Sequence, residues 1–169
     1  MGTIGKIVSS FVVGLIVVGI FVGIGLLMTS SVDIEQTEVY IFQYINEERA
    51  NRNLPILGND TNLSVVSNQW SEHLASINDL THGDFEGRMK DIGYSYYSCG
   101  EIIGSFTSGS VNGIPTENSP SEIAREFVKM WLESPPHREI MLTSSTGYMG
   151  VGVGRYRSVF YGVVDFRFG

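Results

Sequence analysis

The sequence of 169 residues has a mass of 18.6 kDa, enough for one globular domain and a short additional segment. It contains 18 acidic residues against 11 basic ones, a formal net charge of -7 at pH 7. Nucleic-acid binding needs a clustered basic surface, so we expect no nucleic-acid partner. Only 17% of the residues are charged, below the usual quarter, because residues 7–32 contain no charge at all.

Residues 7–28 are almost entirely Val, Ile, Leu, Phe and Gly. As a helix these 22 residues would rise about 33 Å, enough to cross a hydrocarbon core about 30 Å thick. A cleaved signal peptide is the alternative, but its apolar core would be shorter, and the residues after Leu27 form a poor cleavage site. We therefore predict one transmembrane helix at 7–28. Lys6 before it and acidic residues after it place residues 1–6 in the cytoplasm and the remainder outside the cell.

Residues 29–38 are polar and acidic and are predicted to form a short stalk before a domain at 39–169. Without Lys6 the exported part has 10 basic and 18 acidic residues, a net charge of -8. It contains one cysteine, Cys99, so no intramolecular disulfide can form and an ordinary core must provide the stability. We expect an acidic, monomeric domain held at the cell membrane.

Apolar side chains repeated at spacings of three and four predict three helices in this domain. The first ends near Asn51, and the second covers about 62–77. The third has the clearest start, because Ser119 can cap it, Pro120 suits the first helical position and Glu122 completes a capping box.

The C-terminal part has the alternation of strands. Glycine and valine alternate in 150–154, and 159–168 is rich in Val, Tyr and Phe, which predicts a hairpin with its turn at 155–158. A further strand is expected at 100–103, followed by a long surface loop at 104–118. The predicted class is α+β, with helices covering an antiparallel sheet.

Three polar side chains stand out near these elements. His82 follows the second helix, His137 follows a double proline after the third, and Glu101 lies in an otherwise apolar, strand-like segment. A buried carboxylate needs a partner, and an imidazole is a natural one. The remaining histidine, His73, lies inside the second helix and is interpreted as a partly exposed helix residue.

These side chains belong to a series of short motifs whose order and spacing are typical of one family. The residues that carry it are 46–49, 54–57, His82, Arg88, 93–94, 100–102, Trp131, 134–138, Ile140, 150–153 and 166–169. Through them the sequence resembles the CAP (SCP/PR-1-like) superfamily, specifically its prokaryotic branch, over about 39–169.

The resemblance implies a three-layer α-β-α sandwich with a central antiparallel sheet and a cleft open to solvent. In that family two histidines and one or two glutamates line the cleft, and some members bind a divalent metal there. Here His82, Glu101 and His137 match. The second glutamate of many eukaryotic members would fall at Ser134, and Glu133 is one position away, so that role is not transferred.

The chemistry of the three matching residues, His82, Glu101 and His137, allows two interpretations. Two neutral imidazoles and one carboxylate are acceptable ligands for a divalent metal such as zinc. No short ligand motif accompanies them, so a hydrogen-bonded polar cluster that joins helices to the sheet is the alternative.

Two functions follow. The predicted one is a membrane-tethered, extracellular, non-catalytic binding module that recognises a lipid, glycan or protein ligand through the cleft. The alternative is a metal-dependent hydrolase of peptides or esters in which Glu101 is the general base. A serine nucleophile elbow is absent from the sequence, and Cys99 is interpreted as a small buried residue rather than a nucleophile.

Overall fold

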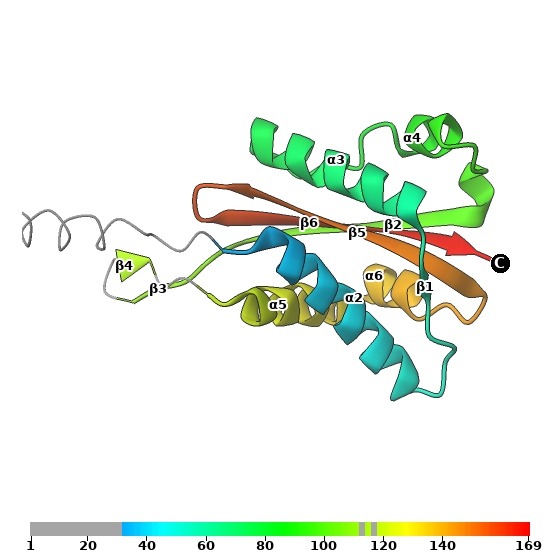
Figure 1. Ribbon diagram of the computed structural model, residues 1–169, viewed down its shortest axis with the longest axis horizontal. Helices are drawn as coiled ribbons and strands as arrows, with labels where there is room; N and C mark the ends of the chain where they lie inside the picture. Colours follow the sequence, from blue (N-terminus) through cyan, green and yellow to red (C-terminus); the bar gives the residue numbers. More distant parts are fainter. Residues whose placement is uncertain (1–31, 112–113, 116–117) are drawn as a thin grey trace, which may run out of the picture. The chain divides into compact units, whose positions relative to one another are not determined.

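The computed structural model describes residues 32–111, 114–115 and 118–169. Figure 1 shows a sheet with α3 and α4 over one face and α2, α5 and α6 over the other, which is a mixed α+β fold in three layers. The elements are α2 (Ile34–Ala50), β1 (Gly58–Asn59), α3 (Thr61–Ile77), α4 (Phe85–Asp91), the 3-10 helix η1 (Tyr96–Ser98), β2 (Cys99–Thr107), β3 (Ser110–Val111), β4 (Ile114–Pro115), α5 (Pro120–Glu133), α6 (Pro135–Met141), β5 (Thr146–Tyr156) and β6 (Val159–Phe168).

The transmembrane helix expected at 7–28 lies outside the described residues. Among the helices that are described, none combines the length and the apolarity needed to cross a membrane.

The main sheet has the strand order β1-β5-β6-β2. β5 and β6 form the predicted hairpin, and β2 pairs with β6 along its whole length, all antiparallel. The expectation of an entirely antiparallel sheet was wrong at one edge, where β1 runs parallel to β5. The chain passes there from α2 on one face to α3 on the other, and its short extended passage runs beside β5 (Figure 1). β2 also extends to Thr107, into the segment 104–118 that was predicted as loop.

The helix ends follow from local capping. Asp33 accepts a hydrogen bond from the Gln36 backbone N–H, so α2 begins at Ile34, within the segment 29–38 that was expected to form a stalk. The capping box predicted at the start of α5 is present. The double proline does end α5, but it also begins α6, since a first-turn proline lacks only an N–H that has no helical partner. His137 therefore lies inside a short helix and not outside one.

α3 rests directly on the backbone of β5. A Cβ atom added at Gly150, Gly152 or Gly154 would lie 2.1–2.3 Å from backbone atoms of α3. The glycines that alternate in the sequence therefore all face this helix, and their missing side chains permit the contact. Two of the facing residues of α3, Ser67 and Ser71, are small, and both are buried.

The opposite face of the sheet is covered by a larger apolar layer. On α5 the apolar spacing predicts a core-facing stripe of Ile123, Phe127, Met130 and Trp131. Three of these residues are fully buried, and Met130 is half-buried. The Trp131 indole N–H also donates to the Ile103 carbonyl oxygen of β2, 3.2 Å away. This layer fixes α5 against the strand that carries Glu101.

A buried arginine joins distant parts of the chain. Arg49, near the end of α2, is fully buried, and its guanidinium donates to the carbonyl oxygens of Pro55, Met141 and Thr143 at 2.8–3.0 Å. Two of these acceptors lie at the end of α6 and just after it. The C-terminal end of α2 is thereby attached to the segment between α6 and β5.

Gly152→Ala tests the contact between α3 and β5. Its Cβ would meet backbone atoms of Ser67 and Asn68 that cannot turn away, so we expect a loss of about 3 kcal/mol or more in the free energy of unfolding. Urea denaturation measures it. Gly147→Ala is the control, because nothing lies within 4 Å of its added Cβ. Equal stabilities for the two variants would contradict the described packing.

Candidate functional site

The segment between α3 and α4 carries His82 and is held on the indole of Trp70. The Trp70 Nε1–H donates to the Thr81 carbonyl oxygen at 3.1 Å. Gly83 has φ +50° and lies against the same ring, where an added Cβ would be 2.5 Å from the indole. A glycine is therefore required beside His82, both for the backbone conformation and for the close approach to Trp70.

Arg88 on α4 connects this segment to the sheet. Its guanidinium carbon lies 3.9 Å from the centre of the Trp70 ring, a cation–π contact. One terminal nitrogen donates to the His82 carbonyl oxygen at 2.9 Å, and the other donates to Oε2 of Glu101 at 2.5 Å. A single side chain thus fixes the backbone of His82 and the carboxylate of Glu101 relative to each other.

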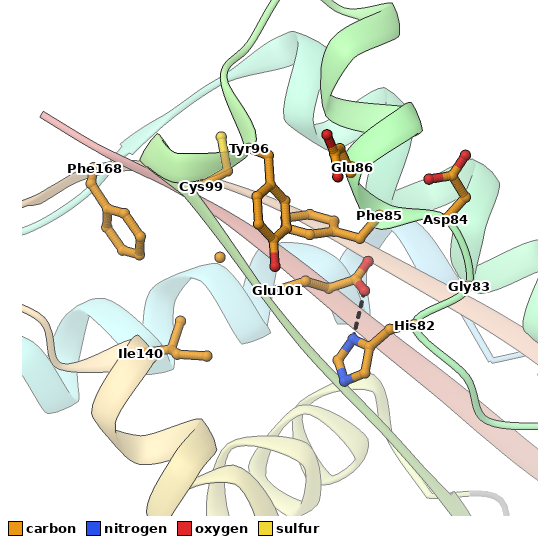
Figure 2. A pocket seen from close by; sticks show the side chains of 11 residues that line it. His82, Gly83, Asp84, Phe85, Glu86, Tyr96, Cys99, Glu101, Ile140 and Phe168 are labelled. Carbon is orange, nitrogen blue, oxygen red and sulfur yellow. Dashed lines mark hydrogen bonds and ion pairs between the residues drawn. The ribbon is translucent and has the colours of Figure 1, made fainter.

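Glu101 lies on β2 with its side chain only 1% exposed. Its Oε1 is 2.7 Å from Nδ1 of His82, so the imidazole partner that the sequence suggested is present. Its Oε2 takes the bond from Arg88. Each carboxylate oxygen therefore has a partner, while the His82 ring stays 54% exposed and turns its other nitrogen away from the bond (Figure 2).

A second buried acid lies beside Glu101. Asp165 on β6 is its cross-strand partner in the register and is fully buried. Burial, and then the charge of Glu101, raise the pKa of Asp165 well above its ordinary range. The Ser67 hydroxyl lies 2.7 Å from Oδ2 of Asp165 and 3.1 Å from the Gly150 carbonyl oxygen. One hydroxyl proton cannot serve both acceptors, so a protonated Asp165 fits this geometry.

His137, the third predicted site residue, is separate from this hydrogen-bonded group. It lies in α6, and its Nδ1 is buried with no hydrogen-bond partner among the described residues. Burial, and then the charge of nearby His82, lower the pKa of its imidazole. His82 and Glu101 are thus directly joined, while His137 is close enough to His82 to interact electrostatically.

A hollow of about 700 Å³ opens over His82 and Glu101. Figure 2 shows this pair on one side of it, Phe85 and Tyr96 next to each other, and Ile140 and Phe168 across from them. The complete lining is His82, Gly83, Asp84, Phe85, Glu86, Tyr96, Cys99, Gly100, Glu101, Ile140 and Phe168. His137 is not part of this lining, although Ile140 comes from the same helix.

The three predicted metal ligands, His82, Glu101 and His137, are not gathered into a three-residue metal group within the described residues. Both carboxylate oxygens of Glu101 already have a partner, Arg88 or His82, and a cation there would have to share them. Nowhere in the described ranges do three His, Cys, Asp or Glu side chains converge as a metal site would require. Only the two imidazoles, His82 and His137, have a ring nitrogen to offer, and Glu101 instead orients the His82 ring.

Sequence reasoning missed two residues of the site. Arg88 was quoted as part of a family motif but was given no role, although a buried glutamate calls for a cation as readily as for an imidazole. Asp165 gave a signal too, since it is an acid within the apolar run 159–168. Its pairing with Glu101 depends on strand register, which the sequence did not supply.

Asp165→Asn tests the protonated state of this acid. A group whose pKa is raised in the folded protein stabilises it most below the ordinary pKa, and that stability falls as pH rises towards the raised value. Wild type should therefore lose stability relative to Asp165→Asn as pH rises from about 4. Urea denaturation between pH 4 and 9 measures the difference in unfolding free energy between wild type and Asp165→Asn. The contributions of titratable groups that both proteins share cancel in this difference. A pH-independent difference would contradict the assignment.

The fold is similar to that of several solved structures. An outer surface protein from Borrelia burgdorferi is 23% identical with a TM-score of 0.64, over 80% of this chain and 95% of that one. An extracellular protein with an SCP domain from Bacillus anthracis is 22% identical with a TM-score of 0.59, over 80% of this chain and 41% of that one. The structure of NaASP2 with Zn²⁺ is 12% identical with a TM-score of 0.58, over 82% of each chain.

At these identities the similarity shows a common fold and nothing of function. No curated protein matches the sequence. Residues 42–166, well over half of the chain, match the family model named CAP, the cysteine-rich secretory protein family. The family name does not describe this chain's own composition, since it has only Cys99. The match agrees with the motif resemblance, and the chain therefore belongs to the CAP family.

Proposed function

We propose that this chain is an extracellular binding module, tethered to the cell membrane through residues 7–28, whose ligand occupies the hollow over His82 and Glu101. The ligand is a lipid, a glycan or a protein segment, and the module does not catalyse a reaction. The observation that carries the proposal is the hydrogen bonding of Glu101, whose two carboxylate oxygens bond to Arg88 and to His82.

A general base needs a lone pair directed at the proton it removes. Glu101 is almost completely buried, and taking up a proton would weaken its ion pair with Arg88. Cys99 offers no alternative nucleophile, because it is buried and its burial raises the pKa of the thiol. These features favour a structural role for Glu101, which fixes the side of the hollow on which His82 is displayed.

The hollow itself has the character of a binding site. Its volume lies within the range usual for ligand sites, and aromatic rings accompany a small number of polar groups. Phe85 and Tyr96 meet edge to face, with ring centres 5.7 Å apart, and Phe168 and Ile140 add apolar surface opposite. Such surfaces contact acyl chains, the apolar faces of sugars or apolar side chains equally well, so all three ligand classes remain in the proposal.

The extracellular location is supported from two directions. The charge pattern around 7–28 favours export of the domain, and two of the similar structures are named as an outer surface protein and an extracellular protein. Zinc also remains a proposal for this site. One similar structure is that of NaASP2 with Zn²⁺, and His82 and His137 are the residues that would hold the metal here.

Turnover assays separate the two functions. We expect purified full-length chain, with and without Zn²⁺, to hydrolyse a panel of peptides and esters no faster than Glu101→Gln does. Because that variant leaves Arg88 without its charged partner, its unfolding curve is measured first. Turnover by wild type that Glu101→Gln abolishes would establish the hydrolase.

Binding is followed by NMR of the histidine side chains during titration with glycan, lipid and peptide pools. We expect a ligand of the hollow to shift the His82 resonances. His73 is the internal control, because it stacks on Trp70 outside the lining of the hollow. Ligands that shift His73 and leave His82 unchanged would refute the proposed site.

Membrane attachment is tested in the cells that produce the protein. The full-length chain should sediment with membranes, and protease added to intact cells should digest the part after residue 32. Recovery of a soluble form that begins near Ser31 would show that residues 7–28 act as a cleaved signal peptide.

A further inference from the structure

One edge of the main sheet has only a short partner strand. β1 pairs with β5 at Tyr148 and Met149 alone, so in the described part of the chain no strand lies beside the rest of β5 on this side. A strand edge without a partner strand has backbone N–H and C=O groups that can pair with an extended peptide. Here α2 and α3 flank the edge from opposite faces (Figure 1). Residues of both helices line a groove beside it.

One hydrogen bond gives the direction of the outward backbone groups. The Val153 N–H donates to Oε1 of Glu38 on α2 at 3.0 Å, so it points away from β6. Alternate residues of a strand present their backbone groups to the same side, so those of Val151 also face the groove. Val151 is among its lining residues. The Glu38 carboxylate takes the position that a carbonyl of a neighbouring strand would occupy.

The groove has a volume of about 480 Å³ and two unlike walls. The α2 wall contains the apolar side chains Val39, which is 47% exposed, and Phe42 beside the polar Glu35, Glu38 and Gln43, whereas the α3 wall contains only the polar side chains Ser64 and Asn68. The lining positions of α2 span 35–43, about 12 Å along the helix axis. That length accommodates three or four residues of extended chain.

The charge in the groove is negative and uncompensated. Glu38 is half-buried, and its burial raises its pKa to about 6, with Glu35 and Glu72 acting in the same direction. Its Oε2 has only a long hydrogen bond, 3.5 Å, from the Asn68 amide. No Lys or Arg is found among the described residues that line the groove. A cation entering the groove would therefore find an acceptor at Oε2 of Glu38.

We propose that this groove binds an extended segment of a partner protein, with a lysine or arginine side chain on Glu38 and an apolar side chain two residues away on Val39 and Phe42. Side chains two apart lie on one face of an extended chain, so both can contact α2. The segment's backbone pairs with Val151. The same edge of a second copy is a poor occupant, because a symmetric pairing would bring its Glu35 and Glu38 against the same carboxylates.

The test uses full-length chain in detergent micelles and two fluorescein-labelled peptides, Thr-Lys-Thr-Val-Thr and Thr-Glu-Thr-Val-Thr. We expect fluorescence anisotropy to show the lysine peptide binding at least about tenfold more tightly. Glu38→Gln should weaken binding of the lysine peptide by about tenfold, since a charged acceptor becomes neutral. The amide oxygen of the variant can still accept from Val153, which protects the fold.

Two controls locate the effect. Glu47→Gln makes the same change on the same helix outside this groove and should leave binding unaltered. Backbone pairing is tested with two N-methylated forms of the lysine peptide. In an extended peptide alternate amides point to opposite edges, so each form has the amides of one edge methylated. The form that is methylated on the edge facing β5 should lose binding, and the other should keep it. Equal affinities for the lysine and glutamate peptides, equal effects of Glu38→Gln and Glu47→Gln, or full binding by both methylated forms would each overturn the proposal.

Discussion

The distance of α3 from the sheet determines where the other parts of the site lie. The helix approaches the backbone of β5 because three glycines provide no side chain to hold it off. Its rotation is fixed as well, since the hydroxyl of Ser67 reaches both Gly150 and Asp165. A helix fixed in both respects places Trp70, and Trp70 in turn supports the segment that carries His82 and the guanidinium of Arg88.

The charges below the hollow are arranged unequally. Two buried acids, Glu101 and Asp165, lie side by side, and Arg88 forms its ion pair with Glu101. Glu101 thus has a compensated charge, whereas the energetic cost of a second buried charge is avoided if Asp165 holds a proton. The neutral acid and Ser67 then form a connection between the sheet and α3.

Much of the fold could be predicted from local patterns. Capping residues and apolar spacing located α3 and α5 to within about a residue, and alternation located the β5–β6 hairpin. The elements that local patterns did not predict are mainly determined by tertiary contacts or are too short to give a pattern. The two short helices α4 and α6 have too few residues for a periodic signal, and β1 is two residues that become a strand only beside β5. Likewise, the glycines of 150–154 indicated a strand, but not that a helix would lie on them.

For the site, the residue types indicated the pair His82 and Glu101, which are in contact. The motif resemblance added His137, which lies near His82 but outside their hydrogen bonds. The partners that decide the chemistry came from elsewhere in the chain. Arg88 reaches Glu101 across the α4 segment, and Asp165 reaches it across a strand pairing, and both relations arise only when the chain is folded.

The contacts of Arg49 have a consequence for how the chain folds as it is made. Its guanidinium bonds to carbonyl groups at Met141 and Thr143, which follow it by 92 and 94 residues. A chain synthesised from its N-terminus cannot bury this cation against those acceptors until most of the domain has emerged. Contacts of such long sequence separation slow folding, because the loop must close before the contact forms. The native core is thus completed only late in synthesis. Shorter nascent chains stay accessible to the chaperones and proteases that act on unfolded protein.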